Sequence, residues 1–152
     1  MERLFRTHFA LLLLGWASAQ TTAQDIVRAS AVPEYVGEHL RILEDPSTLL
    51  TVDEVATSDA FTPLTQKVPN LGISSVVYWL ELFILNDTGE DAVILDLEHS
   101  EVEHVTVYLA TENNPNLIAT TGQGYPLSTR LVAQPEFVFP LPIAKEGIAR
   151  VL

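Results

Sequence analysis

The chain contains no cysteine among its 152 residues, which excludes disulfide bonds and any metal site with thiolate ligands. Basic residues are also scarce, since eight Lys and Arg stand against twenty Asp and Glu, for a formal charge of −12 at pH 7. Binding to nucleic acid or to anionic lipid needs clustered positive charge, so this composition argues against both partners. It permits a soluble domain, a cation ligand or a basic protein partner.

Catalytic motifs are missing as well. The sequence has no glycine-rich phosphate loop, no nucleophile elbow and no pair of histidines at helical spacing. We therefore expect a protein that is not an enzyme and carries no cofactor. Beyond the first twenty residues, no apolar run of the sequence has the length of a membrane-spanning helix.

The first nineteen residues have the order of charges and side-chain sizes that is typical of a secretory signal peptide. Arg3 and Arg6 precede an apolar run over residues 9–14, and Ala17-Ser18-Ala19 fits the small-residue cleavage pattern. The apolar run is short for a bilayer span, so we expect cleavage after Ala19 rather than an uncleaved anchor. The mature protein then begins with a polar leader, residues 20–39, which we expect to be extended or loosely attached.

Residues 40–152 read as short strands between turn signals, which predicts an all-β sandwich. The longest apolar run spans residues 76–85 and stops at Asn86-Asp87-Thr88-Gly89. This boundary fits a glycosylation acceptor but reads equally as a hairpin turn, which we favour and which would pair the run antiparallel with residues 92–97. We expect further strands at 40–43, 49–51, 104–109, 117–120, 137–141 and 148–152. Because the last of these has no polar tail, we expect the sandwich to be truncated there.

One helix is expected, after Thr51. Thr51 followed by Glu54 has the spacing of a capping box, which predicts one or two helical turns ending near Ser58.

The long central strand places different side chains on its two faces, because alternate residues of a strand point in opposite directions. One face is suited to a core and consists of Tyr78, Leu80, Leu82 and Ile84. The other face carries a carboxylate between two aromatic rings and consists of Trp79, Glu81, Phe83 and Leu85. This second face indicates either a ligand groove or a strand covered on both sides, in which Glu81 lies near an end or pairs with a base.

Two other groups of residues are candidates for chemistry. The densest polar cluster holds carboxylates and imidazoles that suit a hard cation or zinc, although a solvated loop is the favoured interpretation; it consists of Asp96, Glu98, His99, Glu101, Glu103 and His104. Arg130 lies in an irregular stretch near Tyr125, where it can bind a carboxylate or sugar hydroxyls, or pair with Glu81 or another acid. We predict a concave ligand-binding surface made of Trp79, Glu81, Phe83, Tyr125 and Arg130.

A series of short motifs follows in order along residues 40–152. They are Leu43-Glu44-Asp45-Pro46, Leu50-Thr51-Val52-Asp53-Glu54-Val55, Phe61-Thr62-Pro63-Leu64, Asn70-Leu71-Gly72, Tyr78-Trp79-Leu80, Val105-Thr106-Val107-Tyr108-Leu109, Thr121-Gly122, Pro126-Leu127-Ser128-Thr129-Arg130 and Phe137-Val138-Phe139-Pro140-Leu141. Together they resemble the type-2 extracellular domain of bacterial seven-transmembrane receptors with diverse intracellular signalling modules (7TMR-DISM).

The resemblance implies a jelly-roll β-sandwich similar to carbohydrate-binding modules. It also implies an exported, periplasmic sensor that precedes seven membrane helices, with a histidine kinase, a diguanylate cyclase or a similar cytoplasmic signalling module as output. The leading functional hypothesis is therefore a periplasmic domain that binds a small molecule, for which a carbohydrate is one candidate. The alternative is a secreted protein-interaction module without a small-molecule ligand. A hydrolase that uses Glu81 is a distant third hypothesis.

Overall fold

The computed structural model describes residues 25–31, 35–98, 101–111 and 114–152, so the predicted signal peptide lies outside the described residues. Within these ranges the chain is mostly β-strand, which confirms the predicted all-β class. The strands are β1 (Ile26–Arg28), β2 (Arg41–Asp45), β3 (Thr62–Pro63), β4 (Val77–Leu85), β5 (Val93–Leu97), β6 (Val105–Thr111), β7 (Asn114–Thr121), β8 (Phe137–Leu141) and β9 (Ile148–Val151). The helices are α1 (Val52–Ala56) and the 3-10 turns Ala29–Ala31, Gly37–His39 and Leu127–Thr129.

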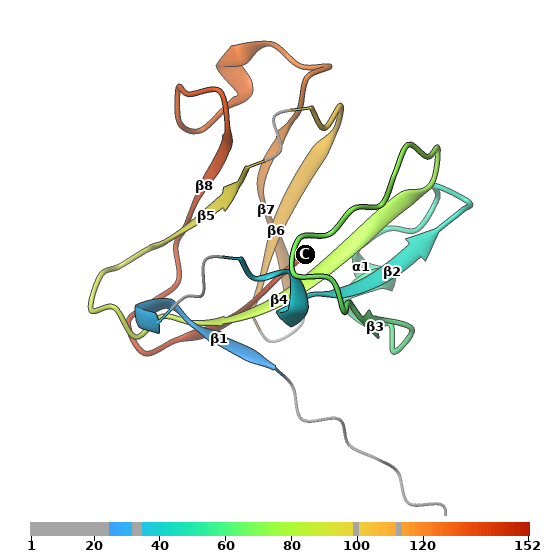
Figure 1. The fold of residues 1–152 in the computed structure, drawn as a ribbon. Helices are drawn as coiled ribbons and strands as arrows, with labels where there is room; N and C mark the ends of the chain where they lie inside the picture. Colours follow the sequence, from blue (N-terminus) through green and yellow to red (C-terminus); the bar gives the residue numbers. More distant parts are fainter. Residues whose placement is uncertain (1–24, 32–34, 99–100, 112–113) are drawn as a thin grey trace, which may run out of the picture.

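The strands form a large sheet and a small one (Figure 1). The large sheet has the order β3-β2-β4-β9-β6-β7, and β1 joins it by pairing with β4. The small sheet contains β5 and β8. Strand β4 is the centre of the large sheet, because its first half pairs with β2 while its second half pairs antiparallel with β9 and parallel with β1.

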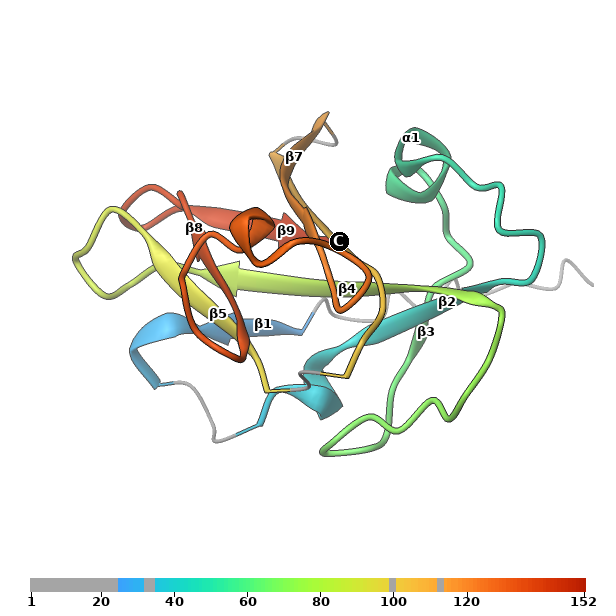
Figure 2. The same cartoon turned by 90° about the horizontal axis from the view of Figure 1, so that it is seen from above.

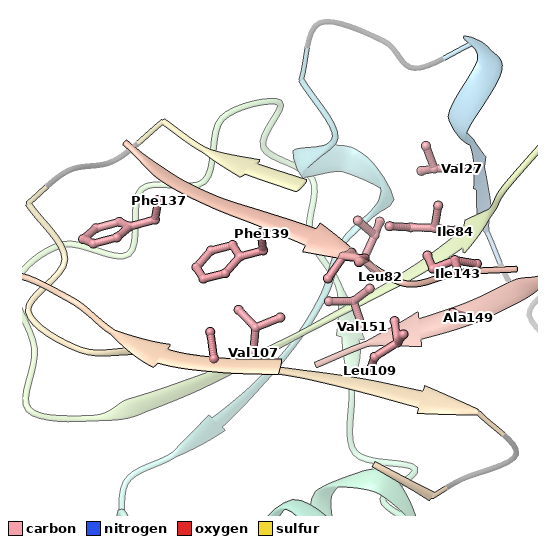
Figure 3. Close-up of a cluster of buried hydrophobic side chains, with 12 residues drawn as sticks. Val27, Leu82, Ile84, Val107, Leu109, Phe137, Phe139, Ile143, Ala149 and Val151 are labelled. Atoms are coloured by element: carbon pink, nitrogen blue, oxygen red, sulfur yellow. The ribbon is translucent and has the colours of Figure 1, made fainter. Parts of the chain in front are cut away.

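The main hydrophobic core lies between the two sheets (Figure 3). The large sheet contributes alternate residues of β4, β6 and β9, as the period of two predicts. The small sheet contributes the rings of Phe137 and Phe139, which are 0% and 2% exposed. The buried members of this core are Val27, Leu82, Ile84, Val107, Leu109, Ala119, Phe137, Phe139, Leu141, Ile143, Ala149 and Val151.

Helix α1 lies to one side of β2 and β4 (Figure 2). A second, smaller core lies beneath it, on the opposite face of the large sheet from the main core. Helix α1 begins at the predicted capping box, in which the backbone N–H and hydroxyl of Thr51 both donate to Glu54 at 2.8 Å. These two hydrogen bonds lower the pKa of the Glu54 carboxyl. The helix buries Val55 and Ala56 against Leu43, Phe61 and Leu152.

The predicted hairpin between β4 and β5 is wrong, since β5 pairs with β8 in the small sheet. The turn after β4 is instead fixed by Asn86, whose side chain is fully buried. Its amide donates to the carbonyls of Glu90 at 2.8 Å and Ile143 at 2.6 Å, and its backbone bonds with Glu146 and Gly147. Asn86 therefore ties together the two connections that cross between the sheets, and it serves the turn rather than an exposed glycosylation site.

The strand expected at residues 49–51 is also wrong, because the chain wraps around the buried carboxylate of Asp45 there. Asp45 is 2% exposed and accepts hydrogen bonds from the backbone N–H groups of Ser47, Thr48 and Leu50, each at 3.0 Å. The hydroxyl of Ser47 adds a further bond at 2.5 Å. A side-chain carboxylate that satisfies successive N–H groups competes directly with strand pairing.

Part of the polar leader is extended and attached to the large sheet. Ile26, Val27 and Arg28 form β1, and Val27 is buried in the main core. The following turn is fixed by Asp87, which accepts two bonds from Ser30 at 2.8 Å and pairs with Arg28 at 2.9 Å.

Candidate functional site

The outer face of β4 carries Trp79, Glu81 and Phe83, as the alternation predicts, but Glu81 is not an open ligand contact. Its side chain is only 2% exposed. A buried carboxylate is stable in its charged form only when it is paired and hydrogen-bonded. The question is therefore which groups pair with it.

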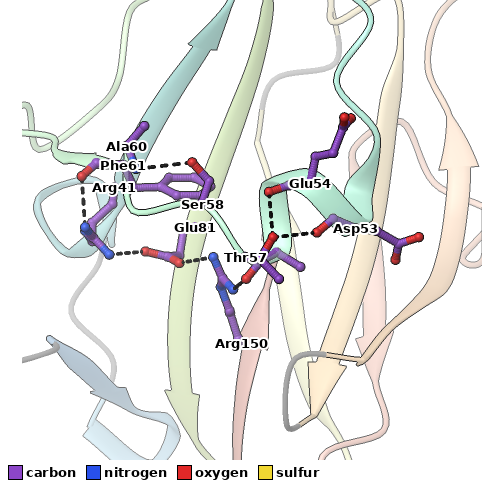
Figure 4. A network of polar contacts seen from close by, with 10 residues as sticks. Arg41, Asp53, Glu54, Thr57, Ser58, Ala60, Phe61, Glu81 and Arg150 are labelled. Atoms are coloured by element: carbon purple, nitrogen blue, oxygen red, sulfur yellow. Dashed lines mark hydrogen bonds and ion pairs between the residues drawn. The ribbon is translucent and has the colours of Figure 1, made fainter.

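Two arginines from the neighbouring strands enclose Glu81 (Figure 4). Arg41 on β2 donates from Nη1 to Oε2 at 2.6 Å, and Nη2 of Arg150 on β9 lies 2.5 Å from Oε1. The strand register explains this convergence. Glu81 stands opposite Arg41 across the β2–β4 pair, while Arg150 stands opposite the next outward-facing residue, Phe83.

The two arginines also join the sheet to the segment that covers it. Nη2 of Arg41 donates to the carbonyl of Phe61 at 2.8 Å, and Nη1 of Arg150 donates to the carbonyl of Ala56. The ring of Phe61 lies against both guanidinium groups, with centroid distances of 5.9 Å to Arg41 and 5.6 Å to Arg150. Each arginine therefore has a fixed orientation, because carboxylate, carbonyl and ring contacts hold it at once.

A cavity of about 370 Å³ opens beside this charged cluster. We name it the arginine cavity. Its walls come from β2, β4, β9 and the residues at and after the end of α1, and its lining consists of Arg41, Ala56, Thr57, Ser58, Asp59, Glu81, Phe83 and Arg150. The side chain of Arg41 is 36% exposed and that of Arg150 is 11% exposed. Two guanidinium groups, two hydroxyls, two carboxylates and an aromatic ring thus line one small concave space.

Arg130 does not pair with Glu81, so that part of the sequence interpretation is wrong. Its guanidinium lies 4.6 Å from the ring centroid of Phe137 and donates to the carbonyls of Gln134 and Pro135. Phe137 belongs to the main core, on the other face of the large sheet from Glu81. Arg130 therefore stabilises the loop before β8 and lies away from the arginine cavity.

Tyr125 also lies apart from Glu81 and Phe83, in a different concavity. Its hydroxyl lies 2.6 Å from Nδ1 of His104, whose Nε2 lies 3.0 Å from the hydroxyl of Thr106. This second cavity has a volume of about 530 Å³ and is lined by Glu103, His104, Gln123, Gly124 and Tyr125. Tyr125 therefore does not share a surface with Glu81 and Phe83, contrary to the prediction of one concave surface.

Trp79 contributes to the second core rather than to a cavity wall. Its ring packs against that of Tyr108, with a centroid distance of 6.3 Å. Its indole Nε1 is buried and has no hydrogen-bond partner in the described part of the chain. Of the five predicted site residues, only Glu81 and Phe83 line the arginine cavity.

Sequence reasoning missed Arg41 and Arg150, the two bases that define the site. Arg41 lies within the predicted strand 40–43 and Arg150 within 148–152, so both were in segments of correctly predicted type. A usable signal was the scarcity of bases, since only six Lys and Arg follow residue 19. A buried carboxylate on the central strand needs a basic partner, and this chain offers only a few.

Neither a metal centre nor a membrane span is found within residues 25–31, 35–98, 101–111 and 114–152. No three His, Asp or Glu side chains in these ranges are placed to hold a metal ion, and His99 of the acidic cluster lies outside them. No helix in the same ranges is long and apolar enough to cross a membrane.

A family model described as 7TMR-DISM extracellular 2 matches residues 37–151, which is most of the chain. The matched region starts before β2 and extends through β9, so it contains every residue of the arginine cavity. No curated protein and no solved structure matches the chain.

Proposed function

The chain belongs to the 7TMR-DISM extracellular 2 family, a family of extracellular domains of seven-transmembrane receptors, and we propose that it senses a small-molecule ligand on the periplasmic side of a bacterial membrane. In this proposal it is exported with its signal peptide and has a jelly-roll topology similar to carbohydrate-binding modules. It binds without catalysing a reaction, and the membrane helices and cytoplasmic module of the receptor carry the signal onward.

The arginine cavity is the observation that supports ligand binding most directly. Ligand pockets typically measure about 300–1,000 Å³ and combine an apolar wall with a few fixed polar groups. The arginine cavity has a volume of about 370 Å³, a wall formed by Phe83 and guanidinium groups held by several contacts each. Fixed polar groups favour binding because little ordering entropy is lost when the ligand arrives.

The cavity also suits a sensor because its walls belong to different parts of the fold. Arg41, Glu81 and Arg150 come from three adjacent strands, and Ser58 comes from the segment after α1. A ligand that contacts several of these elements at once stabilises the conformation in which they lie together. Such a shift between conformations is what a sensor requires.

The test blocks the cavity with a bulky ring at its rim. Asp59 is exposed, so Asp59→Trp narrows the opening while leaving the arginine–glutamate contacts in place. Asp91→Trp is the matched control, since Asp91 is 91% exposed and lies in the turn between β4 and β5. Thermal melts are recorded with a panel of neutral sugars, sugar acids and amino acids.

We expect at least one compound to raise the melting temperature of the wild type and of Asp91→Trp, but not of Asp59→Trp. An equal response in all three proteins would show that the compound binds outside the arginine cavity. A wild type that responds to no member of the panel would favour the protein-interaction module instead.

A further inference from the structure

We propose that the ligand of the arginine cavity is a small hydroxylated carboxylate, such as a sugar acid, and that its carboxylate binds at the exposed side of Arg41. This inference rests on the proposed function, because it specifies the ligand of the same site. It follows from the charges, the hydrogen-bond donors and the rim of the cavity.

The ion cluster of Arg41, Glu81 and Arg150, which lines the cavity, carries one net positive charge. Arg41 and Arg150 carry two positive charges, and the buried Glu81 supplies one negative charge between them. Asp59 also lines the cavity, but it is exposed and forms no ion pair with either arginine in the described structure. Asp59 balances the total charge of the lining from a distance, but Arg41 is 36% exposed and has no second carboxylate in contact among the described residues, so a ligand carboxylate can pair with it directly.

The donors of the arginines are not exhausted by the protein. A guanidinium group has five N–H donors in a planar fork. Arg41 makes one hydrogen bond to Glu81 and one to the carbonyl of Phe61, so several of its donors remain for solvent or a ligand. Nε of Arg150 is buried and has no acceptor among the described residues. The fork geometry of Arg41 suits a carboxylate, which can accept two parallel bonds.

The rim explains why the carboxylate should carry hydroxyl groups. The hydroxyl of Ser58 accepts a bond from the N–H of Ala60 at 3.2 Å, which leaves its own O–H free to donate. The carboxylate of Asp59 can accept bonds from ligand hydroxyls, and the ring of Phe83 offers an apolar surface for the carbon skeleton. The volume of about 370 Å³ lies at the small end of the range for ligand pockets and suits a ligand of monosaccharide size.

Matched sugar pairs test the inference. Isothermal titration calorimetry compares D-galacturonate with D-galactose and D-glucuronate with D-glucose, because each pair differs only at C6. We expect at least one acid to bind about tenfold or more tightly than its neutral partner, the difference that charge-assisted hydrogen bonds contribute. We also expect Arg41→Gln to lose this advantage and Arg41→Lys, which keeps the charge but not the fork, to retain part of it.

The outcomes separate the ligand class from the site. A neutral sugar that binds as tightly as its acid, with binding abolished in Asp59→Trp, would overturn the carboxylate inference and leave the proposed function intact. Acetate binding as tightly as the sugar acids would refute the role given to the hydroxyls. If no uronate binds the wild type, the inference fails, and the panel with Asp59→Trp then decides the proposed function by itself. Circular dichroism verifies that both Arg41 variants are folded.

Discussion

Replacing Glu81 by glutamine should destabilise the protein strongly, although it changes neither the shape nor the size of the side chain. Glu81 is 2% exposed, accepts a charge-assisted hydrogen bond from Arg41 at 2.6 Å and forms an ion pair with Arg150 at 2.5 Å. Glutamine keeps an acceptor oxygen for one guanidinium but presents an NH₂ donor to the other. The variant therefore buries excess positive charge and one mismatched donor pair.

The magnitude follows from the exposure of the two arginines. Removing one partner of a buried ion pair costs about 3–5 kcal/mol. Arg41 is 36% exposed, so water can compensate part of its loss, whereas Arg150 is 11% exposed and has little access to water. We therefore expect a loss near the lower limit, about 3 kcal/mol, which is a large share of the roughly 5–15 kcal/mol that stabilises a typical domain.

Urea denaturation followed by far-UV circular dichroism measures this change. The midpoint should fall while the slope stays the same, because the surface exposed on unfolding is unchanged. Glu44→Gln is the matched control, since Glu44 is an exposed glutamate on the adjacent strand β2. We expect the control to stay within about 0.5 kcal/mol of the wild type. A Glu81→Gln variant as stable as the control would refute the structural role assigned to the ion cluster.

Three further predictions concern other parts of the chain. Hydrogen bonds from the Ser47 hydroxyl and from three backbone N–H groups hold the pKa of Asp45 below its ordinary value of 3.8, so this carboxylate contributes stability above pH 3.8 that is lost as the pH falls through its folded-state pKa. Asp45→Asn should therefore lower the melting temperature at pH 7, the difference from wild type should narrow below about pH 4, and a difference that persists unchanged at pH 2 would contradict the assignment. Gly122 has a φ of 144°, and an added Cβ there would collide with the carbonyl of Glu103, whereas Gly89 has a φ of 80° and open space around it. Gly89→Ala should cost roughly 1–2 kcal/mol and Gly122→Ala clearly more, as measured by urea unfolding, and equal costs would show that the backbone near Glu103 yields easily. The exported protein should begin at Gln20, and an intact mass that includes residues 1–19 would disprove cleavage after Ala19.

The sequence was sufficient for features that depend on neighbouring residues. The apolar run at 76–85 predicted β4 to within one residue, and the Thr51–Glu54 capping box predicted the start of α1. The alternation along β4 also placed Glu81 correctly on the face opposite the main core. These features are set by local propensity and by the period of two.

The pairing of residues that are far apart in the chain could not be predicted from the sequence, for a physical reason. Arg41 and Arg150 approach Glu81 only because β2 and β9 flank β4 in one particular register, and register is a property of the assembled sheet. The hairpin between β4 and β5 was predicted from a turn signal, but the buried amide of Asn86 binds Ile143, which is 57 residues away. The polar sequence around Asn86 gives no sign that its side chain is fully buried.

The ion cluster of Arg41, Glu81 and Arg150 has a consequence for the order of folding. Its members lie 40 and 69 positions apart along the chain, so no local segment can complete it, and each contact must overcome the entropy of closing a long loop. In a partly folded sheet without β9, Glu81 has only Arg41 as its partner in the cluster. Burying Glu81 is then costly, because one of its two ion pairs is missing. The burial of this one carboxylate therefore makes β2, β4 and β9 depend on one another, so that they are stable together as one cooperative unit.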